Sequence, residues 1–422
     1  MSSNSKNETS FSVNITPSGP TLDRNVSVID ESKQITFSWD NLTISAGGSS
    51  GRKGFCGIGK RNPVPKKLIL NNVSGYCKPG QLLAIMGASG AGKSTLLNAL
   101  TYRNLTGLNV ESGARFANGV TVTPNSLTSV SAYVQQDDLF IGTLTVREHL
   151  NFQAAVRMDK HLSHIQRMER VEEVMQELGL KKCENTMIGI QGRIKGISGG
   201  EMKRLAFASE VLTNPPLMFC DEPTSGLDSY MAQNVVEVLK GLANQGKTIV
   251  CTIHQPSSQV YDMFDRVLLM AEGRVAFLGS TAEAAGYFSS IHMPCPVNYN
   301  PADHYIHVLA VTPGNEVECR ENINRVCNTF EASDLGQSMA SEVQYQLDHA
   351  FANEELQKAE KATSPYKASW MAQFRALLKR SFLSVIKEPM IMQVRFFQTI
   401  VSYLFFEFSY QNLTICHCRS LL

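Results

Sequence analysis

The feature that most constrains the fold of this chain is the glycine-rich stretch GASGAGKST, which begins where the short apolar run QLLAIMG ends. An apolar run of this length that ends in glycine is typical of a buried parallel strand. The residues from Leu96 to Thr101 continue as a helix. The stretch also matches G-x-x-x-x-G-K-[ST], whose glycines let backbone N–H groups surround phosphates when it connects a strand to a helix. The sequence therefore predicts a phosphate-binding loop.

We expect every residue of this loop to bind a nucleotide. Lys93 is long enough to reach the outer phosphates, and the hydroxyl of Ser94 can bind Mg²⁺. The alternative is a glycine-rich turn that binds nothing. The expected nucleotide-binding residues of the loop are Gly87, Ala88, Ser89, Gly90, Ala91, Gly92, Lys93, Ser94 and Thr95.

Acidic side chains follow a second apolar run, LMFCDEP. We expect Asp221 to emerge at the carboxyl end of this strand, where open α/β sheets bind ligands. Such an aspartate holds Mg²⁺ directly or through water. Glu222 beside it is the candidate that polarises an attacking water, and the alternative is a solvated loop carboxylate.

Two further polar residues are candidates for the same edge of the sheet. His254 ends another predicted strand, in TIHQP, and is expected to contact the γ-phosphate, although a lone histidine is more often structural. Gln136, in YVQQDD, is a candidate nucleotide and metal ligand. By itself a glutamine of this kind is usually just a loop residue.

The stretch ISGGE precedes the apolar helical run LAFASEVL and allows two interpretations. Ser198 and Glu201 have the S-x-x-E spacing of a capping box, which satisfies the free N–H groups of a helix start. A helix start is also an anion site, since its donors and positive dipole end attract negative charge. These residues alone leave both interpretations open.

The alternation of apolar strands and helical segments predicts an α/β domain over residues 35–311, with a parallel sheet covered by helices. Residues 1–34 are polar and rich in serine and asparagine, which predicts a disordered tail. Residues 312–365 are polar and charged, and we expect a linker there with a helix around residues 338–361.

The C-terminal part changes character again. Residues 366–388 are amphipathic and basic, which suits a helix on a membrane surface, although an ordinary surface helix is the alternative. In residues 389–408 the uncharged part is much shorter than the roughly 20 residues that a spanning helix needs. We therefore expect only a partial first membrane segment there, and residues 409–422 stay unassigned.

Charge and cysteine content exclude some classes. Lys+Arg 39 against Asp+Glu 38 gives no basic excess, so we expect no nucleic-acid partner. The ten cysteines form no C-x-x-C pair, which indicates reduced thiols of a cytosolic domain. The Cys416-His417-Cys418 group is too compact for a zinc site.

The ordered set GASGAGKST, YVQQDD, ISGGE, LMFCDEP, SGLD and TIHQP resembles the ATP-binding cassette of ABC transporters. The resemblance implies a P-loop NTPase fold, with a parallel-sheet core, a helical subdomain and an antiparallel β subdomain. It implies an ATPase that uses ATP and Mg²⁺. The implied catalytic residues are Lys93, Glu222 and His254, and the implied metal-binding residues are Ser94, Gln136 and Asp221.

The same resemblance implies a dimer in which two cassettes pack head to tail. Ser198, Gly199, Gly200 and Glu201 would then form a signature that closes on the ATP held by the partner. Asp228, in SGLD, would lie at the dimer seam. In this arrangement the same residues serve both as the capping box of the helix and as its anion site.

The stretches GTLTVREHL, TSGLDS, TIHQPSS and NPADHYI resemble the G subfamily, whose half-transporters place one cassette before six membrane helices. The stretch SWMAQFRALLKRSFLSVIKEP resembles the White branch of that subfamily. We therefore expect a C-terminally truncated, White-like half-transporter subunit. Two features depart from the common cassette pattern: Ile197 and Glu201 replace Leu and Gln in the signature, and Phe55 is the only aromatic residue of the basic insert, so no adenine platform is assigned.

The implied function is ATP-driven transport of small organic molecules, such as pigment precursors, lipids or sterols. The implied partner is a second half-transporter subunit, identical or different, and the cassette would lie on the cytoplasmic side of a membrane. The short chain alone is expected at a membrane surface or in the cytosol. Two alternatives stay open: a truncated cassette that acts as a regulatory dimerisation partner, and a soluble ABC ATPase.

Overall fold

The computed structural model describes residues 29–47, 66–190, 192–350 and 367–419. The predicted tail up to residue 28 and the insert with Phe55 lie outside these residues. Residues 29–34, expected in the disordered tail, instead pack on the domain: Ile29 is buried and its N–H donates to the carbonyl of Gln245 at 2.9 Å.

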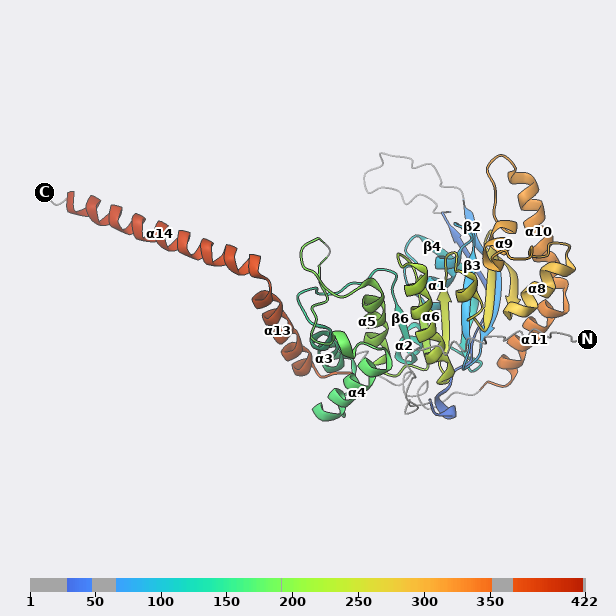
Figure 1. Cartoon of the computed structure of the whole chain (residues 1–422), viewed down its shortest axis with the longest axis horizontal. Coiled ribbons are helices and arrows are strands. Elements are labelled where there is room, and N and C mark those ends of the chain that lie inside the picture. Colours follow the sequence, from blue (N-terminus) through green and yellow to red (C-terminus); the bar gives the residue numbers. More distant parts are fainter. Residues whose placement is uncertain (1–28, 48–65, 191, 351–366, 420–422) are drawn as a thin grey trace, which may run out of the picture.

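A six-stranded sheet forms the centre of the molecule, in the order β10-β9-β3-β8-β7-β6 (Figure 1). All its pairings are parallel except that of β9 with β10. The strands are β3 (Leu82–Gly87), β6 (Ser131–Val134), β7 (Leu217–Cys220), β8 (Thr248–Thr252), β9 (Arg266–Ala271) and β10 (Arg274–Gly279). Because parallel strands end at one edge, the segments after β3, β6, β7 and β8 meet there.

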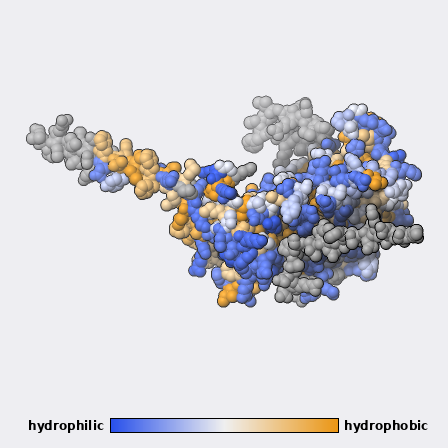
Figure 2. Space-filling model, viewed as in Figure 1, coloured by the Kyte–Doolittle hydropathy of each residue, from blue (hydrophilic) through white to orange (hydrophobic). Residues whose placement is uncertain are grey.

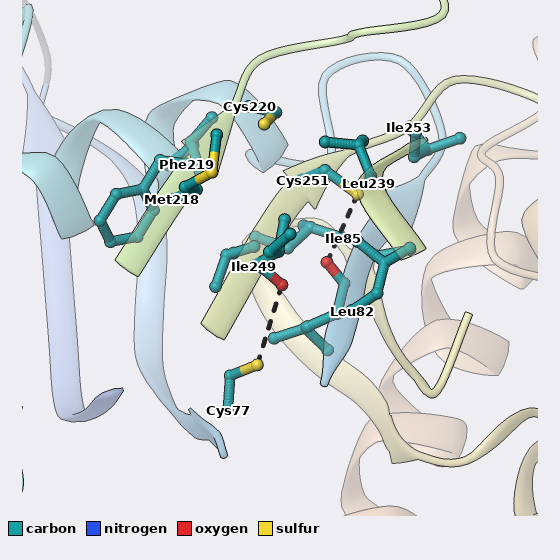
Figure 3. Close-up of a cluster of buried hydrophobic side chains, with 14 of the residues drawn as sticks. Cys77, Leu82, Ile85, Met218, Phe219, Cys220, Leu239, Ile249, Cys251 and Ile253 are labelled. Carbon is teal, nitrogen blue, oxygen red and sulfur yellow. Dashed lines mark hydrogen bonds between the residues drawn. The ribbon is translucent and has the colours of Figure 1, made fainter. Parts of the chain in front are cut away.

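The central strands are almost wholly apolar because helices cover both faces of the sheet. Figure 3 shows this core, in which Phe219 and Ile249 pack beside the buried cysteines. The thiol of Cys77 donates to the carbonyl of Ile249 at 3.8 Å, and burial raises the pKa of Cys77 to about 12. Cys77, Cys183, Cys220, Cys251, Cys295, Cys319 and Cys327 are free thiols.

A second, four-stranded antiparallel sheet has the order β2-β1-β4-β5. Its strands are β1 (Phe37–Ala46), β2 (Lys67–Cys77), β4 (Leu108–Ala117) and β5 (Val120–Thr121). The parallel-sheet core and the antiparallel β unit of the predicted fold are therefore both present.

Helices surround the two sheets. Helices α3, α4 and α5 contact one another and form the helical unit, and α13 contacts α3. The helices up to residue 308 are α1 (Lys93–Thr101), α2 (Pro124–Val130), α3 (Val146–Arg157), α4 (His164–Glu177), α5 (Gly199–Val211), α6 (Ser229–Asn244), α7 (Ser258–Tyr261), α8 (Thr281–Ser290) and α9 (Pro301–Val308), with two 3₁₀ turns at Glu31–Lys33 and Lys181–Cys183.

Residues 312–365, expected to be a polar linker, instead contain helices that pack on the domain. Helices α10 (Glu316–Ala332) and α11 (Asp334–Asp348) fold there, and they contact β10 and β2. The reason is a narrow apolar stripe: Ile323, Val326 and Phe330 are each 1% exposed on an otherwise polar helix. The helix expected at residues 338–361 overlaps α11, which starts earlier and ends at Asp348, and residues 351–361 lie outside the described residues.

The C-terminal segments are helical. Helix α13 (Trp370–Lys387) is followed by α14 (Pro389–Arg419), which runs away from the sheets in Figure 1 and carries apolar side chains in Figure 2. Residues 409–419, left unassigned from the sequence, continue α14. Among the described residues, none of the helices combines the length and the apolar character that crossing a membrane requires.

Candidate nucleotide-binding site

The glycine-rich loop connects β3 to α1, as the sequence predicts. Gly87 has no room for a side chain, because a Cβ there would lie 2.3 Å from the carbonyl oxygen of Met270. Gly92 precedes α1 in a left-handed conformation, with φ of 102°, and gives α1 no side-chain cap. The first N–H groups of α1 are therefore left for a ligand.

The amine of Lys93 spans the mouth of this loop. It donates to the carbonyl oxygens of Gly87 at 2.9 Å and Ala88 at 3.0 Å, and the residue is 7% exposed. Burial lowers the pKa of Lys93, while the nearby carboxylate of Glu222 raises it. The loop and Glu222 are thus close enough to influence each other electrostatically.

Asp221 follows β7 and is fixed by two hydroxyl groups. Thr252, at the end of β8, donates to its Oδ1 at 2.8 Å, and Tyr133 on β6 donates to its Oδ2 at 3.3 Å. The carboxylate therefore stands at the carboxyl edge of the sheet, supported by the two strands that flank β7.

Glu222 has an unusual backbone for a residue with a side chain, with φ of 43°. Two hydrogen bonds hold it: its N–H donates to the hydroxyl of Thr252 at 2.9 Å, and the amide of Gln136 donates to its Oε2 at 2.8 Å. Gln136 and Glu222, which are 86 residues apart in sequence, are therefore joined directly.

His254 lies just beyond β8 with an exposed side chain. It lines a cavity of about 450 Å³ together with Glu222, residues 224–227 and the start of α6. The predicted neighbours of the sheet edge, Asp221, Glu222, His254 and Gln136, are thus gathered there.

The signature residues begin helix α5 and form the predicted capping box. The N–H and hydroxyl of Ser198 donate to the carboxylate of Glu201 at 2.8 and 2.9 Å, and the N–H of Glu201 donates to the hydroxyl of Ser198 at 3.3 Å. Ser198 and Gly199 are exposed, whereas Gly200 is buried.

Asp228 caps the neighbouring helix α6, accepting from the N–H of Met231 at 2.8 Å. A Cβ on Gly199 would lie 3.3 Å from Leu227, so the starts of α5 and α6 are adjacent. The two features expected at a dimer seam therefore lie side by side on this chain.

Sequence reasoning missed three residues that support the site. Thr252 and Tyr133 hold Asp221, and Lys203 on α5 donates to the backbone carbonyl of Gln136 at 2.5 Å. The one available signal was position: Thr252 and Tyr133 lie near the ends of predicted strands next to the aspartate. Nothing local in the sequence marks Lys203.

The oxygen ligands of the site suit Mg²⁺. Ser94 and Gln136 are exposed, and Asp221 offers a single carboxylate whose position is fixed. No group of three His, Cys, Asp or Glu side chains that could hold a metal occurs in the described ranges. Magnesium needs no such group, because it keeps water and phosphate oxygens among its ligands.

Comparisons with known proteins indicate the family of the chain. The family model described as ABC transporter matches residues 70–225, and one described as ABC-2 type transporter matches residues 254–322. Protein white of Drosophila melanogaster is 50% identical over 381 residues, which cover 87% of this chain and 54% of that protein. The ABC transporter ATP-binding protein/permease wht-1 of Caenorhabditis elegans is 47% identical over 81% of this chain and 52% of that protein. Protein scarlet of Drosophila melanogaster is 42% identical over 79% of this chain and 50% of that protein.

The fold, the site and these similarities define an ATP-binding cassette of the ABC transporter family, which is a family of ATPases. Within that family the chain belongs to the White-like half-transporters of the G subfamily. The chain spans about half the length of the curated relatives it matches.

Proposed function

We propose that this chain is the ATP-binding and ATP-hydrolysing part of a White-like half-transporter, which powers the transport of small organic molecules such as pigment precursors, lipids or sterols. The observation that supports it best is the connected group at the sheet edge. Thr252 holds Asp221 and Glu222, and Gln136 holds Glu222, next to the phosphate-binding loop.

Nucleotide binding begins at the loop between β3 and α1. Lys93 exchanges its two backbone acceptors for the phosphates, and the free N–H groups of α1 add donors. Ser89, Gly90 and Thr95 complete the cradle. Ser94, Gln136 and Asp221 would hold Mg²⁺, which supplies neutralisation of the phosphate charge.

Hydrolysis then depends on positioning. Glu222 orients and polarises the attacking water, since its carboxylate is fixed at the edge of the sheet. His254 lines the same cavity as Glu222 and would contact the γ-phosphate. Charge stabilisation by Lys93 and His254 supplies most of the rate in a site of this kind.

The second half of each site comes from a partner cassette. Ser198, Gly199 and Gly200 start a helix whose dipole and N–H groups would favour an anion, and the exposure of Ser198 and Gly199 leaves this helix start accessible to another chain. Asp228 lies beside them at the proposed seam. The partner is a second half-transporter subunit, identical to this chain or different.

Helix α13 connects the cassette to a membrane on its cytoplasmic side. Its inner face contacts α3 and the segment before it: Lys387 donates to the carboxylate of Glu148 at 2.6 Å, and the hydroxyl of Ser384 lies 3.1 Å from that of Thr143, which precedes α3. Its other face exposes Trp370, Phe374, Leu378 and Phe382, which suits the boundary of a lipid layer.

The test compares purified wild type with two variants. Lys93→Ala should lose binding of a fluorescent ATP analogue, because the loop loses its cation. Glu222→Gln should keep that binding, stop Mg²⁺-dependent ATP hydrolysis and accumulate as a dimer with ATP in sedimentation. Unchanged nucleotide affinity in Lys93→Ala, or normal hydrolysis in Glu222→Gln, would reject these roles.

A further inference from the structure

Lys203 is a buried cation outside the proposed catalytic group. It lies in the second turn of α5, and only 5% of the residue is exposed. Its amine donates to the backbone carbonyl of Gln136 at 2.5 Å and to the Oδ1 of Asp138 at 3.1 Å. Burying an amine is costly unless it is fully paired, so these two contacts fix where the lysine can be.

Gln136 is consequently held at both ends. Its backbone carbonyl accepts from Lys203 of α5, and its side-chain amide donates to Glu222. Ser198 caps the same helix α5, and its hydroxyl belongs to the capping box. A continuous path of bonded groups therefore runs from the start of α5 through Lys203 and Gln136 to Glu222.

Asp138 strengthens the attachment without reaching the catalytic group. Burial raises the pKa of Asp138, while Lys203 lowers it. The side chains of the pair are 6% and 14% exposed, so water screens their attraction only weakly.

We propose that Lys203 is a positioning residue: it ties the Gln136 loop to helix α5, so that the helix serving the partner's nucleotide also sets the Gln136–Glu222 pair acting on this chain's own nucleotide. This inference rests on the proposed function. The contact between Lys203 and Gln136, which are 67 residues apart in sequence, would link this chain's own nucleotide site to the helix that serves the partner's site.

The test is steady-state ATP hydrolysis by the full chain at a concentration where wild type dimerises. Lys203→Met keeps the length of the side chain and removes its donors. We expect kcat to fall about tenfold or more, because a misplaced loop spoils the alignment of Glu222. The KM for ATP should change less than about threefold, since the phosphate-binding loop is untouched.

Two variants separate positioning from loss of stability. Lys247→Met is a matched control: Lys247 is also a buried lysine, 1% exposed and bonded to Asn214, but it precedes β8 at the end opposite the site. It should lower the melting temperature and keep kcat near that of wild type. Lys203→Arg should recover most of the lost rate, because it restores donors to the Gln136 carbonyl.

A double-mutant cycle decides the mechanism. If Lys203 acts through Gln136, then Lys203→Met should change kcat less than about twofold in a Gln136→Ala background. An equal loss in both backgrounds, or an equal loss of kcat in Lys247→Met, would overturn the proposal. Absence of hydrolysis in wild type would instead overturn the proposed function itself, and the role of Lys203 with it.

Discussion

The hydroxyl of Thr252 donates to Asp221 at 2.8 Å and accepts from the N–H of Glu222 at 2.9 Å, so one buried side chain fixes both acidic residues of the site. Thr252 ends β8, and the acidic pair follows β7, the strand beside it. Thr252 therefore links the proposed metal ligand to the proposed base, while Tyr133 also holds Asp221 and Gln136 also holds Glu222.

Replacing this threonine by valine keeps its shape and removes both hydrogen bonds. We expect Thr252→Val to lower kcat for ATP hydrolysis about tenfold or more. It should also lower the free energy of unfolding by about 1 kcal/mol, because the half-buried carboxylate of Asp221 and the N–H of Glu222 each lose a partner. Thr252→Ser should retain most of both quantities. Steady-state kinetics and urea unfolding measure them, and a fully active valine variant would remove Thr252 from the site.

A bulky cation at the start of α5 should separate binding from turnover. Ser198→Arg should leave the affinity of the chain for an ATP analogue unchanged, since the phosphate-binding loop is intact, and should abolish hydrolysis that depends on dimer concentration. Loss of the cap lowers the free energy of unfolding by about 1 kcal/mol. Ser198→Ala loses the same cap without adding a cation, so it is the matched control. Equal loss of binding and hydrolysis in Ser198→Arg would make these residues a cap alone.

The attachment of α13 to α3 should depend on pH through Glu148. Burial alone would raise the pKa of Glu148. The hydrogen bonds from Lys387 and from the N–H of Thr145 lower it by more, so the pKa lies below its usual value of 4.5. Such a carboxyl stabilises the contact above its unfolded pKa and loses this contribution as the pH falls through the lower, folded pKa.

Amide hydrogen-exchange protection in α13 measures this attachment. We expect protection at about pH 7, falling below the usual carboxyl pKa as Glu148 is protonated. Glu148→Gln should show weak protection of α13 both at about pH 7 and below the usual carboxyl pKa. The contact would not depend on Glu148 if this variant kept the wild-type profile.

The packing of α10 can be tested by truncating its buried stripe. Phe330 is 1% exposed and contacts the rings of Phe277 and Tyr287, so Phe330→Ala should lower the free energy of unfolding by about 3–5 kcal/mol. Val317 on the same helix is 73% exposed, and Val317→Ala should change it by less than about 0.5 kcal/mol. If Phe330→Ala and Val317→Ala had equally small effects on the free energy of unfolding, α10 would not be packed on the domain and the segment would be a linker.

The motifs predicted the central features of the site because each is local. The loop from Gly87 to Thr95 and the capping box of Ser198 and Glu201 are encoded within a few residues, where backbone geometry and helix-start chemistry act. The edge position of Asp221 followed from strand periodicity together with the rule that parallel strands end on one side.

The supporting contacts could not be predicted in this way. Lys203 and Gln136, or Ser384 and Thr143, meet only when distant segments are folded together, and their separate surroundings in sequence give no sign of the partner. The buried stripe of α10 was hidden for a different reason. Its few apolar residues recur at helical spacing within a polar segment, so the average composition indicated a linker.

The contact between α13 and α3 gives the chain two separate mechanical supports. The phosphate-binding loop is rooted in the parallel sheet through β3, whereas a pull on α13 is applied first to α3, which packs on α4 and α5. In the proposed dimer, tilting that unit would move Ser198 relative to the partner cassette, while the phosphate-binding loop would stay fixed to the sheet. The sheet would then act as the rigid support of the nucleotide, and the unit of helices α3, α4 and α5 as the part that moves.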